Sequence, residues 1–172
     1  MNFVLNLKHW QVFTLFVILS LPTMIEFEDV FYSYLISTVF WCVFVIYYLM
    51  LGLELSKVAT AQLKGNITLF IINSVIIITA TLSLLLFFNG HFSGKGFLGL
   101  IVMIYLFYAF FQFFTYPVKT LKSIEQDSLA SFSQYFLSLM QVIFLPIGIW
   151  WLQPRINKVS ESYPIQNKHP SI

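Results

Sequence analysis

Long apolar runs alternate with short polar stretches along the whole chain. Charged residues delimit five hydrophobic segments, at about residues 10–25, 30–53, 67–88, 97–116 and 135–152. A helix needs about 20 apolar residues to cross the hydrocarbon core of a bilayer, with a range of about 17–25. The middle three segments meet this requirement easily, whereas the first and the fifth lie near its lower limit.

The hydrophobic segments are expected to be helical, because a bilayer offers no water to the polar groups of the backbone. A transmembrane β-barrel would show strands of about 10 residues with alternating polarity, and residues 70–78 show no such alternation. The pattern therefore predicts an all-α integral membrane helical bundle. We expect one transmembrane domain over residues 1–159 and a disordered tail over residues 160–172, which is polar and contains two prolines.

The fifth segment, residues 135–152, leaves two topologies open. If all five segments span, five cationic residues lie on one side and four on the other, which decides no orientation. If the fifth segment is re-entrant or interfacial, the count becomes eight against one, a strong positive-inside bias. Pro146 and Gly148 favour a break in this segment, although both residue types are ordinary in spanning helices. Both topologies place the N-terminus and the loop with Lys57 and Lys64 in the cytoplasm.

The composition agrees with a membrane protein and excludes several other classes. Apolar residues make up 59% of the chain and charged residues 9%, against about 25% charged residues in soluble domains. The net charge of +2 is too small to indicate binding of nucleic acid. The single cysteine, Cys42, excludes an intrachain disulfide and a cysteine-based metal site. The three histidines show no metal-binding spacing, so we expect neither metal nor cofactor.

The N-terminal segment is also compatible in outline with a signal peptide. Lys8 precedes its apolar run, but the residues that follow offer no small-x-small cleavage site. We therefore expect the segment to be retained.

Polar side chains inside the hydrophobic segments are the first candidates for a functional site. Three amides lie at membrane depth, namely Asn73, Gln112 and Gln141. An unpaired amide in hydrocarbon is costly, so each is expected to face a neighbouring helix. They either form interhelical hydrogen bonds or line a polar path or pocket inside the bundle. Glu54, just past the second segment, is expected to be a solvated helix end.

The stretch between residues 117 and 134 is the longest connection between segments. Its apolar and polar residues fall mostly on opposite sides of a helical wheel. This pattern is typical of a short helix in the membrane interface, and a solvated linker remains the alternative.

The run over residues 146–158, with the sequence PIGIWWLQPRINK, is the most distinctive in the chain. We expect Pro154 to stop the helix after Trp151. Arg155 and Lys158 then lie in the headgroup layer, where the arginine fork can bind lipid phosphate. The run is either a stop signal at the membrane interface or a contact with lipid headgroups or a partner.

This run resembles the C-terminal signature of small multi-pass membrane proteins of flavobacteria-like bacteria. The similarity also covers LKHWQ at residues 7–11 and VKTLKS at residues 118–123. The resemblance implies a bacterial protein in the inner membrane, and it brings no activity with it.

Three functions fit these observations. The first is a non-enzymatic membrane protein that acts through helix contacts with itself, as a homo-oligomer, or with a membrane protein partner. The second is a channel or carrier for a neutral solute that uses the three amides. The third is an enzyme acting on lipid-like substrates with Glu54, Lys57, Lys119 and Lys122. Ionisable residues are absent from the interior of the segments, which argues against a proton-coupled transporter. We expect the first function and no enzymatic activity.

Overall fold

The computed structural model describes residues 4–25, 30–63, 65–88, 96–143 and 148–162. Its elements over these ranges are η1 (Val4–Asn6), α1 (His9–Ser20), η2 (Leu21–Met24), α2 (Val30–Val58), α3 (Ile67–Phe88), α4 (Phe97–Gln126), α5 (Phe132–Ile143) and α6 (Ile149–Ser162). No strand occurs in the described ranges, and the prediction of an all-α chain is confirmed there.

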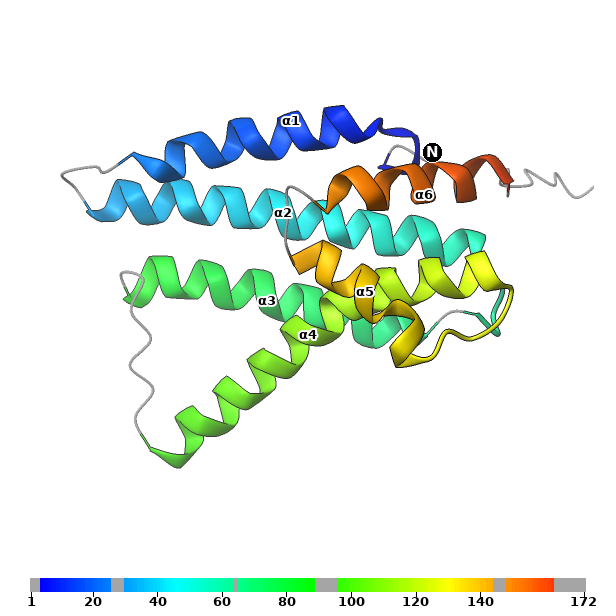
Figure 1. Cartoon of the computed structure of the whole chain (residues 1–172). Coiled ribbons are helices and arrows are strands. Elements are labelled where there is room, and N and C mark those ends of the chain that lie inside the picture. Colours follow the sequence, from blue (N-terminus) through cyan, green and yellow to red (C-terminus); the bar gives the residue numbers. More distant parts are fainter. Residues whose placement is uncertain (1–3, 26–29, 64, 89–95, 144–147, 163–172) are drawn as a thin grey trace, which may run out of the picture.

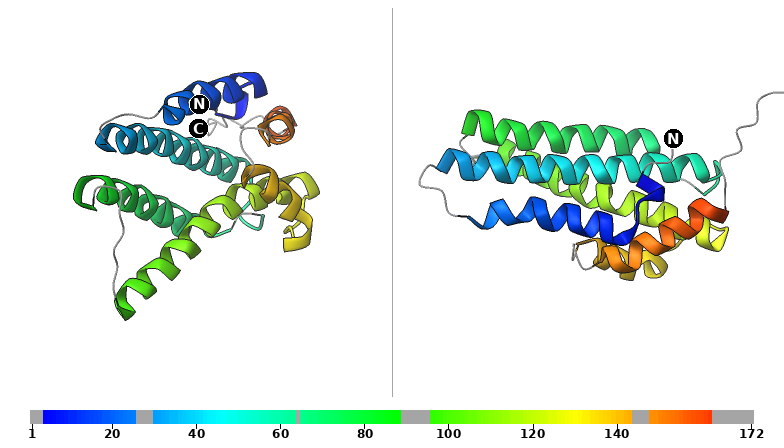
Figure 2. Two further views of the ribbon diagram at one scale, coloured as in Figure 1. Left: turned by 60° about the vertical axis from the view of Figure 1, so that its left-hand side comes forward. Right: turned by 90° about the horizontal axis from the view of Figure 1, so that it is seen from above.

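Three of the helices are long and apolar enough to cross a membrane. These candidate spans cover Phe31–Val58 of α2, Ile67–Leu84 of α3 and Phe97–Gln126 of α4. The first predicted segment forms a shorter apolar stretch, His9–Met24, which lies beside α2 (Figure 1). The two further views show the same arrangement of α1, α2 and α3 (Figure 2). Three such helices are fewer than the five spans of one expected topology and the four of the other.

The fifth predicted segment is divided between two short helices. α5 ends at Ile143 and α6 begins at Ile149, and Pro146 lies outside the described residues. α5 runs from the end of the molecule where α4 terminates toward the middle, and α6 runs back (Figure 1). A side chain at Gly148 would collide with the carbonyl oxygen of Gln141. Glycine at this position therefore allows the two backbones to approach each other.

α4 continues well beyond its predicted end at residue 116. Pro117 lies inside the helix, which runs on to Gln126 and ends at Asp127 in the left-handed conformation with a φ of 49°. The backbone N–H of Ser128 donates to the carbonyl of Ser123 at 3.2 Å, as in a Schellman motif. The first half of the predicted connection is thus the last part of a long helix, neither a separate interfacial helix nor a solvated linker.

α6 differs from its prediction at both ends. Pro154 lies inside the helix and does not end it, since α6 begins at Ile149 and continues to Ser162. Residues 160–162 belong to α6, so the predicted disordered tail begins too early. Its remainder, 163–172, lies outside the described residues.

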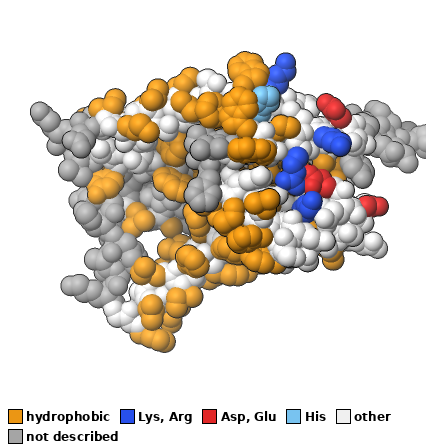
Figure 3. All heavy atoms as spheres, viewed as in Figure 1, with side chains coloured by type: hydrophobic (Ala, Val, Ile, Leu, Met, Phe, Trp, Pro, Cys, Tyr) orange, Lys and Arg blue, Asp and Glu red, His pale blue; other side chains and the backbone are white. Residues whose placement is uncertain are grey.

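The charged side chains that the structure describes all lie at one end of the molecule, which we call the charged end (Figures 1 and 3). This end holds the start of α1, the C-terminal ends of α2 and α4, and α6. The charged residues are Lys8, Glu54, Lys57, Lys119, Lys122, Glu125, Asp127, Arg155, Lys158 and Glu161. Arg155 and Lys158 therefore share an end with Lys8 and Lys119, as expected if the fifth segment does not cross. Lys64, Lys95, Lys168 and the acidic residues 26–29 lie outside the described ranges.

Candidate functional site

An apolar groove lies between α3 and α4. It has a volume of about 740 Å³ and lies where the N-terminal half of α4 diverges from α3 (Figure 1). We call it the α3–α4 groove. Its lining residues are Ile76, Thr79, Ala80, Ser83 and Leu84 of α3, with Val102, Met103, Leu106, Phe107 and Phe110 of α4.

The two walls of the groove differ in the size of their side chains. The α3 wall contains Thr79, Ala80 and Ser83, whereas the α4 wall carries Phe107 and Phe110. Small residues spaced about one helical turn apart allow another helix to approach the backbone closely. The α3 wall is therefore the side on which a further helix fits best.

The hydroxyl groups of the α3 wall also differ from those elsewhere on the same helix. Ser74 and Thr81 donate to the carbonyls of Phe70 and Ile77 at 2.7 and 2.9 Å. Thr79 and Ser83 make no hydrogen bond within the described part of the chain. In a hydrocarbon environment a hydroxyl without a partner is unfavourable, so the α3 wall offers two free hydrogen-bonding groups to an occupant.

Two of the three predicted amides meet between α3 and α4. The side chain of fully buried Asn73 donates to Gln112 Oε1 at 3.1 Å and accepts a hydrogen bond from the Tyr105 hydroxyl at 3.0 Å. Asn73 lies one turn before Ile76, which lines the α3–α4 groove. The cluster joins the two helices where they begin to diverge, as expected of interhelical hydrogen bonds.

Gln141 does not join this cluster. It lies on α5, and its Oε1 is buried with no hydrogen-bond partner among the described residues. The alternative in which all three amides line one polar path is therefore not supported by their positions.

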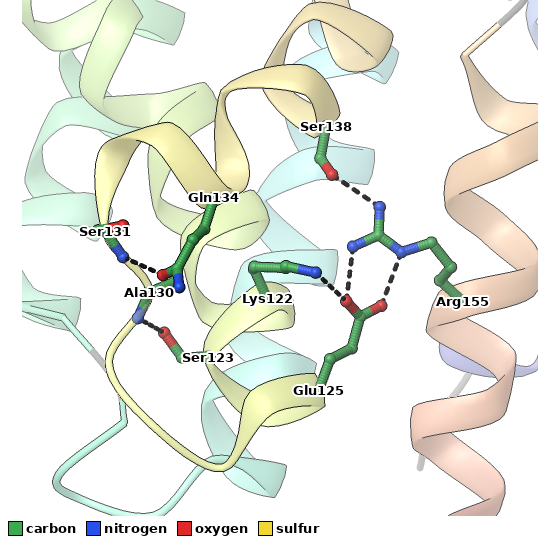
Figure 4. Close-up of polar contacts among 8 residues, drawn as sticks. All are labelled: Lys122, Ser123, Glu125, Ala130, Ser131, Gln134, Ser138 and Arg155. Carbon is green, nitrogen blue, oxygen red and sulfur yellow. Dashed lines mark hydrogen bonds and ion pairs between the residues drawn. The ribbon is translucent and has the colours of Figure 1, made fainter.

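Arg155 binds other residues of the chain through most of its guanidinium group (Figure 4). Its Nε and Nη2 donate to the two carboxylate oxygens of Glu125, both at 2.7 Å, and its Nη1 donates to Ser138 Oγ at 2.7 Å. Lys122 Nζ lies 3.5 Å from the same carboxylate. This network ties α6 to α4 and α5, so the fork predicted for lipid phosphate is already occupied. Lys158 lines an adjacent hollow of about 400 Å³.

The ion pair shifts the titration of Glu125, which lies beyond the apolar run 97–116. Partial burial alone would raise the pKa of Glu125, but the Arg155 hydrogen bonds and charge, with Lys122, outweigh burial and hold this pKa below its usual value. Because the pKa of Glu125 is lower in the folded state, its ionised side chain stabilises the fold at pH values above the pKa in the unfolded chain. This stabilisation disappears as the pH falls through the pKa in the folded state.

Replacing Glu125 with glutamine is expected to lower stability slightly at neutral pH. The Arg155 and Glu125 side chains keep 29% and 22% of their surface exposed, so we expect a loss of less than about 1 kcal/mol. Thermal unfolding in detergent across an acid titration measures the effect. The difference between Glu125→Gln and the parent chain should vanish at low pH. A difference that persists there would contradict the charge-based explanation.

Gln153 is a buried polar residue that the sequence patterns did not single out. It is 1% exposed, and its Oε1 accepts a hydrogen bond from the Tyr47 hydroxyl at 2.9 Å. Its Nε2 lies 3.1 Å from the carbonyl of Val4 and 2.9 Å from that of Leu7. It also lies 3.1 Å from Asn157 Oδ1. Gln153 thus joins α2 and α6 to the N-terminal turn.

Glu54 contributes to the same junction and is not the solvated helix end that was predicted. It is 4% exposed, and its Oε2 accepts a hydrogen bond from the backbone N–H of Leu5 at 3.0 Å. A carboxylate held by a backbone amide has a structural role that explains its burial. The described residues hold no group of three His, Cys, Asp or Glu side chains that could bind a metal ion.

No model of a protein family, no curated protein and no solved structure matches the chain. The features of the chain that bear on function are the α3–α4 groove, the Asn73–Gln112 pair and the polar junctions at the charged end.

Proposed function

We propose that the chain is a multi-pass membrane protein that acts without catalysis, through helix contacts with a second copy or with a membrane protein partner. The observation that carries this proposal is the α3–α4 groove, which the side chains of the described residues leave unfilled. Its length on α3, from Ile76 to Leu84, corresponds to about 12 Å of helix. A neighbouring helix can lie along this distance for about two turns.

The chemistry of the groove favours a helix as its occupant. Ala80 and its small neighbours allow close backbone contact, which supports helix association in lipid, where the hydrophobic effect gives no driving force. The free hydroxyls of Thr79 and Ser83 can bond to polar groups of a partner helix, which an acyl chain lacks. The carrier hypothesis has less support, because the polar groups of Asn73 are bonded to Gln112 and Tyr105.

The distribution of charge supports one orientation in the membrane. We infer that the charged end faces the cytoplasm, because the described residues there include six cationic and four acidic side chains. The N-terminal turn then lies on the cytoplasmic side. The stretch His9–Met24 lies beside α2 (Figure 1), and we infer that it completes a fourth crossing. The resemblance to inner-membrane proteins of bacteria supports that location.

Filling the groove is expected to abolish the proposed association. Ala80→Leu places a larger side chain on the α3 wall, whereas Val75→Leu changes α3 at a position that is 53% exposed and outside the groove lining. Gentle detergent purification of the tagged chain, with its copurifying proteins identified, measures the association. We expect a stoichiometric partner or homo-oligomer with the parent chain and Val75→Leu, and its loss with Ala80→Leu. A parent chain that purifies alone as a monomer, or an association that survives Ala80→Leu, would contradict the proposal.

A further inference from the structure

The two short helices at the charged end have the geometry of a hairpin that enters the membrane and returns. α5 runs from the charged end toward the middle of the molecule, and α6 runs back to the charged end (Figure 1). The 12 residues of α5 correspond to about 18 Å of helix, well short of the ~30 Å hydrocarbon core. The pair is therefore too short to reach the opposite end.

α5 has apolar residues on both of its faces. One face buries Tyr135, Leu139 and Val142 against the rest of the molecule. The other face is exposed and carries the large apolar side chains of Phe132, Phe136, Leu137 and Ile143, which are between 45% and 70% exposed. A cluster of this kind is unfavourable in water. Because α5 lies beside helices that are candidate membrane spans, lipid is the medium that fits this face.

Three tryptophans mark the level of the hairpin relative to the membrane surface. The ring of Trp150, at the start of α6, lies 4.7 Å from the ring of His9 and 5.5 Å from that of Phe13, at the start of α1. Trp10, Trp150 and Trp151 are all about half exposed. Tryptophan prefers the boundary between headgroups and acyl chains, so the start of α6 lies near this boundary.

The hairpin is also fixed at its open end by polar contacts. Arg155 of α6 bonds to Ser138 of α5 and to Glu125 of α4 (Figure 4). These contacts hold both helices against α4, which provides the protein surroundings that re-entrant backbone requires. Lys158, one turn further along α6, is exposed toward the headgroup side, where its charge favours phosphate groups.

We propose that α5 and α6 form a shallow re-entrant hairpin in the interfacial layer of the lipid leaflet at the charged end, with its inner end at the boundary between headgroups and acyl chains and the exposed apolar face of α5 against the acyl chains. The partner of this surface is the phospholipid leaflet itself. The proposal is independent of the α3–α4 groove, because it places both ends of the hairpin on one side of the membrane whatever the groove binds.

Single cysteines in the full-length chain test this arrangement. The native Cys42 is first replaced by serine, and one cysteine is then introduced at Leu137, Ser162 or Thr60. Leu137 lies on the exposed apolar face of α5, Ser162 is exposed at the end of α6, and Thr60 is exposed between α2 and α3 at the charged end. The purified variants are reconstituted into phosphatidylcholine–phosphatidylglycerol vesicles and treated with a membrane-impermeant maleimide. A fluorophore attached at Leu137→Cys is exposed to doxyl-labelled phospholipid as a quencher.

We expect Ser162→Cys and Thr60→Cys to react from the same side of the vesicle. Leu137→Cys should react at least about tenfold more slowly from either side, as for an apolar face embedded in lipid, and its fluorophore should be quenched by the labelled lipid. Reaction of Ser162→Cys from the side opposite to Thr60→Cys would overturn the proposal, because the segment would then span. Rapid labelling of Leu137→Cys would also overturn it. Protection without lipid quenching would do so as well, since protein would then cover α5.

Discussion

Replacing Gln153 with leucine is expected to destabilise the chain by about 2–4 kcal/mol and to release the N-terminal turn from α2 and α6. The substitution leaves the Tyr47 hydroxyl and the carbonyls of Val4 and Leu7 without their partner. A buried polar group that loses its hydrogen bond costs about 1–3 kcal/mol, and Tyr47 is only 6% exposed. Unfolding of the purified protein by SDS titration measures the loss.

The control is the same substitution at a glutamine that is exposed. Gln126 ends α4 and is exposed, so Gln126→Leu should change stability by less than about 0.5 kcal/mol. Hydrogen exchange of the backbone amides at residues 4–7 adds a local readout, because they should exchange faster in Gln153→Leu. Equal stability of both variants would mean that Gln153 does not hold the N-terminal turn in place.

The starts of the three long helices could be predicted from hydrophobicity alone. The predicted segments 30–53, 67–88 and 97–116 start where α2, α3 and α4 start, because loss of charge marks entry into lipid. The end of α4 was missed because its last turns are amphipathic and pack against the molecule. The helix continues past the apolar run, and a search for apolar residues alone does not detect this last part. The break between α5 and α6 lies where Pro146 and Gly148 favoured one, and the backbone of Gln141 leaves no room for a side chain at Gly148.

The contacts of the candidate residues could be predicted only where their partners lie on neighbouring helices. Asn73 and Gln112 were expected to face neighbouring helices, and they face each other. Arg155 was expected in the headgroup layer, at a stop signal or in contact with lipid or a partner. Its pairing with Glu125 was missed because Glu125 lies thirty residues away in the sequence, beyond the reach of a local pattern. Gln153 did give a signal, since it shares the buried face of α6 with Ile149, Leu152 and Ile156. A lone amide on an apolar helix face indicates a buried hydrogen-bonding role.

Replacing Gly52 with alanine is expected to destabilise the contact between α2 and α3 by about 1–2 kcal/mol, net of the ~1 kcal/mol that alanine contributes to helix stability. A Cβ at Gly52 would lie 2.5 Å from Phe70 Cζ and 2.6 Å from Phe70 Cε1. The Phe70 ring cannot easily move aside. It is fully buried and lies nearly parallel to the rings of Tyr116 and Phe113, with centroid distances of 4.3 and 5.8 Å.

Gly65 provides a matched comparison because it contacts the same Tyr116 ring from another side. A Cβ at Gly65 would lie 3.6 Å from Tyr116 Cδ2 and Cε2, an ordinary van der Waals distance. Gly65→Ala should therefore leave stability unchanged or raise it slightly, since alanine restricts the unfolded chain, while Gly52→Ala lowers it in the same SDS titration. If both substitutions leave stability unchanged, α2 and α3 can move apart without a loss of stability. The aromatic stack would then not determine how closely these two helices pack.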